Sequence, residues 1–210
     1  MKSLYVVLAS ALLATPGLAA PKNEPPPKSA GELAAEAQAA QEHEALTAAE
    51  TLAHDTSVAM EKWIDSKATT EERLFARLYF PTPNTTPQRY TTQYDALAER
   101  DLIAIEDKAL LSDKTFQYAI VTDSNGYIPA HNTRFTKPLT GNAQQDYLNN
   151  RTKRMLADTA SLIAARSEAP HLILRTKLET GEVVYDMSVP IVVRGKHWGC
   201  ARVGYKRVTE

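Results

Sequence analysis

The chain has a single cysteine, Cys200, among its 210 residues. One thiol excludes an intrachain disulfide framework, a cysteine-rich zinc site and the CxxCH attachment of a c-type haem. A surplus of positive charge is also missing: 24 basic residues face 25 acidic ones, so no nucleic-acid surface is predicted. With 43% hydrophobic and 23% charged residues, the composition is typical of one globular domain with extensions.

Long apolar runs are missing as well. Residues 4–13 are mostly apolar but fall short of the roughly 20 residues that cross a bilayer. They follow a basic start at Lys2 and precede small residues, with Gly17 and Ala19 at −3 and −1 of a cut after Ala19. This layout predicts a signal peptide over residues 1–19 and a periplasmic protein. An uncleaved anchor helix is the alternative.

A long helical region is expected after a proline-rich linker at residues 20–28. Ser29 and Glu32 have the spacing of a capping box, and alanine is dense up to Ala59. Residues 29–79 therefore predict one or two long helices. A heptad-like seam runs along them through Leu46, Ala49, Ala53, Thr56, Met60 and Trp63. This seam suggests a homodimer or a protein–protein interaction module.

Charge is distributed unevenly between the two ends of the chain. Residues 21–62 hold three basic and eight acidic groups, whereas residues 145–210 hold eleven basic and seven acidic ones. Two interpretations stay open: a solvated helix face, or a helix that docks on the basic half or on a partner.

Residues 80–210 predict an antiparallel sheet of about five strands in an α+β fold. A turn with three prolines at residues 80–87 and a helix at 90–108 come first, and a helical crossover at 143–167 interrupts the sheet. Asn125-Gly126 predicts a hairpin turn, and strict alternation over residues 183–193 predicts one buried face. The expected strands are residues 116–121, 127–131, 171–178, 183–193 and 197–206.

Three stretches resemble the periplasmic sensor region of a group of bacterial methyl-accepting chemotaxis proteins. Residues 79–90 are similar to Y-x-P-I-P-G-T-x-P-x-Q-[FY], with Thr82 and Asn84 at the Ile and Gly positions and Gln88 displaced by one. Residues 123–132 are close to D-x-N-G-Y-x-P-x-H-N. Residues 180–205 resemble T-G-E…D-x-S-x-P-I…G-x-H-W-G-x-x-R-x-G-Y.

This resemblance implies a PAS-like sensor domain of the Cache type over residues 80–210. The HAMP linker and cytoplasmic signalling coiled coil of those receptors do not follow in this sequence. We therefore expect a free-standing, exported module that binds a small molecule and acts through a receptor or kinase partner.

Eight residues are candidates for ligand binding: Tyr127, His131, Asn132, Arg151, Arg154, Tyr185, His197 and Trp198. His131 and Asn132 leave the end of an expected strand, where they either enter a cavity or satisfy local backbone groups. The arginines suit a carboxylate, and core packing is the alternative for both tyrosines. Only one of the adjacent His197 and Trp198 can face a pocket.

No cofactor is expected, but a b-type haem held by His131 or His197 is an alternative. Enzyme motifs do not match: Ser188 is not in a G-x-S-x-G elbow, and Cys200 lies mid-strand between small residues. The chain is therefore predicted to be non-enzymatic.

Overall fold

The computed structural model describes residues 27–178 and 180–207. The predicted signal peptide and most of the proline-rich linker lie outside the described residues. Within the described part, no helix is both long and apolar enough to span a bilayer.

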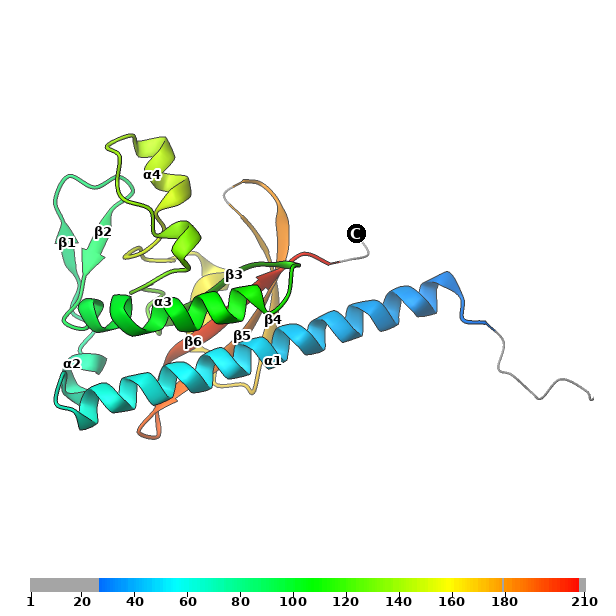
Figure 1. Ribbon diagram of the computed structural model, residues 1–210, viewed down its shortest axis with the longest axis horizontal. Helices are drawn as coiled ribbons and strands as arrows, with labels where there is room; N and C mark the ends of the chain where they lie inside the picture. Colours follow the sequence, from blue (N-terminus) through cyan, green and yellow to red (C-terminus); the bar gives the residue numbers. More distant parts are fainter. Residues whose placement is uncertain (1–26, 179, 208–210) are drawn as a thin grey trace, which may run out of the picture.

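The fold is α+β, with a four-stranded antiparallel sheet in the order β3-β6-β5-β4 and a separate two-stranded sheet, β1-β2 (Figure 1). The helices are α1 (Ala30–Asp65), α2 (Glu71–Phe75), α3 (Asp95–Leu111), η1 (Thr133–Phe135), α4 (Ala143–Asn149) and α5 (Thr159–Arg166). The strands are β1 (Phe80–Thr82), β2 (Arg89–Thr91), β3 (Phe116–Asp123), β4 (Leu172–Lys177), β5 (Val183–Val193) and β6 (Lys196–Tyr205).

Helix α1 has the start that its sequence predicts. The Ser29 hydroxyl accepts from the Glu32 N–H at 3.2 Å, and a Glu32 carboxylate oxygen accepts from the Ser29 N–H at 2.7 Å. This reciprocal pair satisfies two N–H groups that the first turn leaves free. The helix ends at Asp65 because Lys67 takes a left-handed φ of 59°, and a new cap at Thr70 starts α2.

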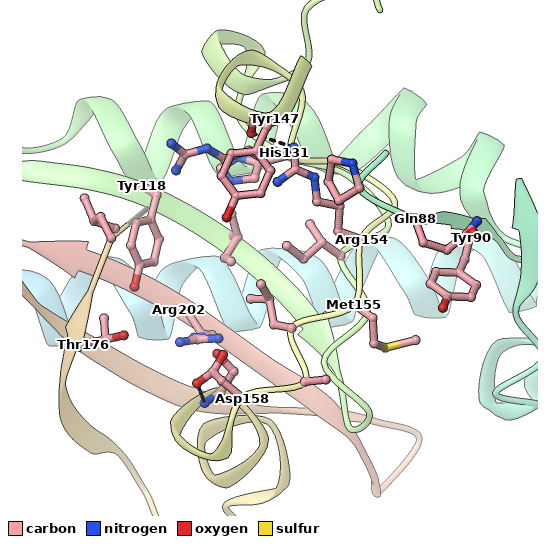
Figure 2. A pocket seen from close by; sticks show the side chains of 18 of the residues that line it. Gln88, Tyr90, Tyr118, His131, Tyr147, Arg154, Met155, Asp158, Thr176 and Arg202 are labelled. Carbon is pink, nitrogen blue, oxygen red and sulfur yellow. Dashed lines mark hydrogen bonds between the residues drawn. The ribbon is translucent and has the colours of Figure 1, made fainter. Parts of the chain in front are cut away.

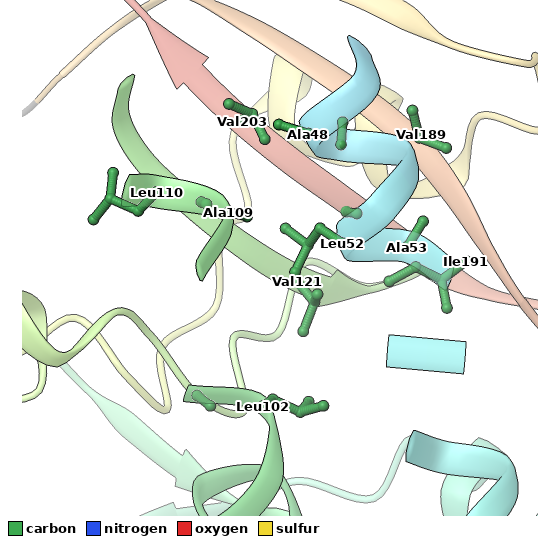
Figure 3. Packing of buried hydrophobic residues seen from close by; sticks show 14 of the residues in the cluster. Ala48, Leu52, Ala53, Leu102, Ala109, Leu110, Val121, Val189, Ile191 and Val203 are labelled. Atoms are coloured by element: carbon green, nitrogen blue, oxygen red, sulfur yellow. The ribbon is translucent and has the colours of Figure 1, made fainter. Parts of the chain in front are cut away.

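The heptad seam of α1 is part of the chain's own core. Helices α1 and α3 lie side by side, and α1 packs on β5 and β6 (Figure 1). Figure 3 shows Leu52 and Ala53 of α1 against Val121, Val189 and Ile191 of the sheet. Five seam residues are buried there, and Leu46 is partly buried. The expected role of these six side chains as a docking surface is therefore corrected, whereas a homodimer through another surface stays a prediction.

Some of the acidic groups of α1 do meet the basic half of the chain. Glu42 pairs with Arg207 at 3.0 Å, and Asp65 pairs with Arg194. Glu36, Glu44 and Glu50 are exposed to solvent. Both interpretations of the acidic helix therefore hold in part: some of its carboxylates are solvated and others pair with the basic half of the chain. Apolar side chains form the contact between α1 and the sheet, and the ion pairs lie at the edge of that contact.

The sheet has four strands because residues 127–131 do not form the predicted return strand. The turn at Asn125-Gly126 is present, but Ile128 bonds to residues 153 and 154 instead of to β3. Pro129 has no N–H, which weakens any ladder there. The outer N–H groups of β3 at Ala119, Val121 and Asp123 are bonded to Asn132 Oδ1, Glu106 Oε1 and the Tyr127 carbonyl.

Two further local expectations are corrected. The crossover at residues 143–167 is two short helices. Its middle, residues 150–158, is irregular, with a turn at residues 152–153, and residues 153–156 bond to residues 126–128. The proline-rich turn after residue 79 contains the short pair β1-β2, in which Pro81 lies opposite Tyr90. A three-residue pair at an edge tolerates a missing donor.

Asp123 joins the ends of several elements. Its Oδ1 accepts from the N–H groups of Asn125 and Tyr127, at 2.9 and 3.0 Å. Its Oδ2 accepts from the Tyr79 hydroxyl at 2.6 Å, and Arg77 lies 3.7 Å away. The aspartate of the D-x-N-G-Y stretch thus shapes the turn and ties it to the segment before β1.

We predict that Glu106→Gln stabilises the protein at neutral pH. Burial raises the pKa of the Glu106 carboxyl well above its usual value, although the Val121 N–H opposes this shift. The folded state then holds a proton that the unfolded chain releases, so its stability falls as pH rises above the unfolded pKa. Glutamine keeps the acceptor without this cost.

Thermal unfolding from pH 4 to 8 measures the effect. The Tm advantage of Glu106→Gln is expected to grow with pH, by about 2–4 °C per kcal/mol for a chain of this size. The exposed Glu50→Gln is the matched control. A constant difference between Glu106→Gln and wild type across the pH range would contradict a proton held by Glu106.

Candidate functional site

A cavity of about 620 Å³ lies on the sheet face opposite α1. Tyr118, Ile120 and Arg202 line it, and they alternate along their strands with core residues that face α1. The rest of its wall comes from residues 87–90, from Ile128 and His131, from the segment 147–161 and from residues 176–178 (Figure 2). The cavity therefore lies between the sheet and the crossover segment.

The floor of the cavity is built on a buried ion pair. Arg202 Nε donates to Asp186 Oδ2 at 2.9 Å, Arg202 Nη2 contacts the same oxygen, and the Tyr118 hydroxyl donates to it at 2.9 Å. Burial lowers the pKa of the Arg202 guanidinium, but Asp186, with Tyr118 and Cys200, raises it by more, so Arg202 stays charged. Burial, with Asp186 adding to it, raises the pKa of Tyr118 well above its usual value, so its hydroxyl remains a donor.

Two polar atoms of this floor remain unused by the fold. Arg202 Nη1 and Asp186 Oδ1 are buried and have no hydrogen-bond partner among the described residues. A native interior rarely leaves such groups unpaired, so each one needs an explanation.

Gly204 makes room for the Tyr118 ring on this floor. A Cβ at Gly204 would lie 2.2 Å from Tyr118 Cε1, which no side chain could tolerate without moving the ring. The small residue two places after Arg202 thus lets the tyrosine lie across the strand and reach Asp186.

The roof of the cavity is a neutral histidine among arginines. The His131 ring packs edge-on against Phe135, with 4.8 Å between ring centroids. Burial holds the pKa of His131 well below its usual value, and the charges of Arg151, Arg134 and Arg154 add to the shift. The guanidinium of Arg151 lies 4.1 Å from the Phe135 ring centroid. Arg154 Nη2 donates to the carbonyls of Asp146 and Tyr147, at the end of α4.

The side walls are mostly apolar, with one acid. Ile120, Ile128 and Leu156 are among the residues that line the cavity. Asp158 also lines the cavity and caps α5, with Oδ1 accepting from the Ser161 N–H at 3.0 Å. Burial raises the pKa of Asp158, but the Ser161 hydrogen bonds and the charge of Arg202 together lower it by more, so this carboxyl is ionised at neutral pH.

Three of the eight candidate residues line the cavity, namely His131, Arg151 and Arg154. Asn132 lies against β3, where its Oδ1 accepts from the Ala119 N–H at 3.0 Å. The Tyr127 hydroxyl bonds to Asp95 at 2.9 Å. These two side chains hold the turn and its return segment in place and are absent from the cavity lining.

The other three candidates also lie away from the cavity. Tyr185 faces α1 and stacks with Arg207, whose guanidinium lies 3.6 Å from its ring centroid. Trp198 is buried in the core, with Nε1 donating to the Leu74 carbonyl at 3.3 Å. His197 Nε2 lies 2.9 Å from the Ala165 carbonyl oxygen. His131 and His197 thus do not share the cavity, and a haem there would have His131 alone.

The residues that sequence reasoning missed are on the strands. Arg202 and Asp186 are charged residues of the neighbouring strands β6 and β5, and they pair in the cavity floor. Tyr118 of β3 donates to the same aspartate. The sequence signal that could have identified Arg202 is an arginine within a mostly apolar stretch of strand, with a glycine two positions later.

No protein-family model matches the chain, and no match was found among curated proteins. The chain is similar to a solved extracellular ligand-binding receptor from Desulfohalobium retbaense DSM5692. The TM-score is 0.42, the identity is 13%, and the match covers 84% of this chain. It covers 25% of the receptor chain, so this chain spans about a quarter of the receptor's length. No functional conclusion follows from similarity at this level.

We predict that Asn132→Ala destabilises the protein and leaves the cavity's binding properties unchanged. The variant removes the acceptor of the buried Ala119 N–H, and an unpaired buried donor costs about 1–3 kcal/mol. Chemical denaturation of this variant beside Asn149→Ala, at an exposed position of α4, is the measurement. An unchanged unfolding free energy with weaker ligand binding would instead place Asn132 in the binding site.

Proposed function

We propose that this chain is an exported, non-enzymatic sensor module of the Cache type, which binds a small molecule in the cavity and acts through a partner protein. The observation that carries the proposal is the cavity itself. Its volume of about 620 Å³ lies within the usual range for small-molecule sites. Buried polar atoms on its floor and roof, Arg202 Nη1 and His131 Nδ1, have no partner among the described residues.

The chemoreceptor resemblance supports the same site. The H-W-G-x-x-R-x-G-Y stretch contributes Arg202 and Gly204, which build the floor with Tyr118. The D-x-N-G-Y-x-P-x-H-N stretch contributes Asp123, which shapes the turn, and His131 on the roof. The motif residues that are not on the cavity thus hold in place the segments that form it.

The chemistry of the candidate nucleophiles supports a binding role. Burial raises the pKa of the Cys200 thiol to about 11, so it is protonated at neutral pH. A protonated thiol is a poor nucleophile. The Ser188 hydroxyl donates to the Leu172 carbonyl at 3.3 Å.

Export and signalling complete the proposal. The signal-like residues 1–19 would deliver the module to the periplasm, where a receptor or kinase would be its partner. N-terminal sequencing of protein recovered from periplasm is expected to begin near residue 20; a mature chain that begins at Met1 would contradict the export step.

We predict that compounds which bind the protein do so in the cavity. A library of small metabolites is screened by thermal shift, and hits are measured by calorimetry against wild type and Leu156→Trp. The indole would occupy space in the cavity, so an affinity loss of at least ten-fold is expected.

The control is Ile163→Trp, which places the same side chain on the exposed face of α5, at a residue that is 50% exposed. Wild-type affinity is expected for it. If no compound stabilises the wild type, or if Leu156→Trp binds the hits as tightly as Ile163→Trp does, the cavity is not the ligand site.

A further inference from the structure

We infer that the ligand of this cavity is an organic monoanion, a carboxylate carried on an apolar body, which is anchored by Arg202. This inference rests on the proposed function and names the chemical class that the site selects. It is carried by the charge of the lining, by the unused donor on the floor and by the apolar walls.

Positive charge dominates the cavity lining. Among the residues that the structure describes, four cationic side chains line it, those of Arg151, Arg154, Lys177 and Arg202, against one carboxylate, that of Asp158. Asp186 pairs with Arg202 from below. An anion entering this site is attracted, whereas a cation is repelled.

Arg202 is held in one orientation and keeps a donor unused. Asp186 Oδ2 binds its Nε and Nη2, which fixes the plane of the guanidinium. Its Nη1 has no partner among the described residues, although the side chain is only 4% exposed. A guanidinium that is fixed on one side binds a carboxylate on the other at little entropic cost, through charge-assisted hydrogen bonds.

The roof favours the same charge. Arg151, Arg134 and Arg154 produce a positive potential at His131, whose imidazole stays neutral there. A neutral imidazole adds no competing charge and offers a donor or an acceptor, depending on its tautomer. The positive potential that disfavours an imidazolium favours a bound anion.

The apolar walls of the cavity favour a ligand that carries a single charge on an apolar body. The lining side chains of Ile120, Ile128 and Leu156 are apolar and offer a ligand no hydrogen bonds. A dianion such as a phosphate monoester would leave water at a higher cost than a monoanion, and Arg202 Nη1 is the floor nitrogen that has no partner among the described residues. A monocarboxylate with an apolar or aromatic body matches both the floor and the walls.

Three probes of the same shape test the charge class: 3-phenylpropanoate, 3-phenylpropanamide and 3-phenylpropylamine. They are anionic, neutral and cationic at neutral pH and share one apolar body. Calorimetry on the wild type at fixed ionic strength is expected to give an affinity for the carboxylate at least ten-fold higher than for the amide, with the amine weakest.

Variants of the floor test the anchor. Arg202→Lys keeps a charge for Asp186 but removes the planar donor, so it should weaken carboxylate binding at least ten-fold and amide binding much less, because the hydrogen bond to a carboxylate is charge-assisted. The double variant Asp186→Asn/Arg202→Gln removes both charges together and so avoids an uncompensated buried carboxylate. It should bind the carboxylate no more tightly than the amide. Arg175→Lys, at an exposed position of the same sheet, is the matched control and should bind like the wild type.

The outcomes separate this inference from the proposed function. If the amide or the amine binds the wild type as tightly as the carboxylate does, and Leu156→Trp abolishes that binding, the charge class is wrong and the cavity is still the ligand site. A carboxylate preference that survives in both Arg202 variants overturns the anchor. If none of the three probes binds, the inference is wrong, and the metabolite screen then decides the proposed function.

Discussion

The outer edge of β3 is closed by side chains, and the rest of the architecture depends on this. An open strand edge leaves N–H groups without partners. Here Asn132 and Glu106 each supply a side-chain oxygen to one of them, and the Tyr127 carbonyl takes a third. Because no fifth strand is needed at this edge, the chain after Tyr127 is free to leave the sheet, pair with residues 153–156 and form the wall of the cavity.

The two faces of the sheet differ because one of them carries a buried ion pair. Towards α1 the sheet presents mainly apolar side chains, together with the rings of Tyr185 and Tyr205, and these pack with the alanines of the helix. On the opposite face Arg202 and Asp186 occupy the centre of the sheet. A buried pair of this kind contributes little net stability, and its loss on one side is costly. We therefore attribute its presence to binding, since an apolar pair would pack at least as well.

Several elements could be predicted because their signals are local. Strand β5 matches the alternation of residues 183–193, and the capping box at Ser29 starts α1 as expected. The predicted return strand at residues 127–131 failed for a non-local reason. The turn signal was correct, but nothing in residues 125–131 reveals that Asn132 and Glu106 occupy the strand edge.

The candidate site was recognised only in part for a similar reason. His131, Arg151 and Arg154 lie next to turns and helix ends, where polar residues attract attention, and all three line the cavity. Arg202 and Tyr118 lie inside strands, and a strand pattern does not say which face is hollow. Trp198 and Tyr127 belong to the motifs with the strongest resemblance, yet they serve the core and the turn.

The sequence by itself determined the α+β class, the long capped helix, all four strands of the sheet with close boundaries, and the residue types of a binding site. These follow from periodicity, caps and turn residues, which act over a few positions. Only the tertiary structure decided that the helical seam is internal core, that the fifth strand is replaced by side chains, and that Arg202 faces a cavity. Each of these depends on contacts between residues far apart in the chain, such as Tyr118 with Asp186, and no local pattern encodes such a contact.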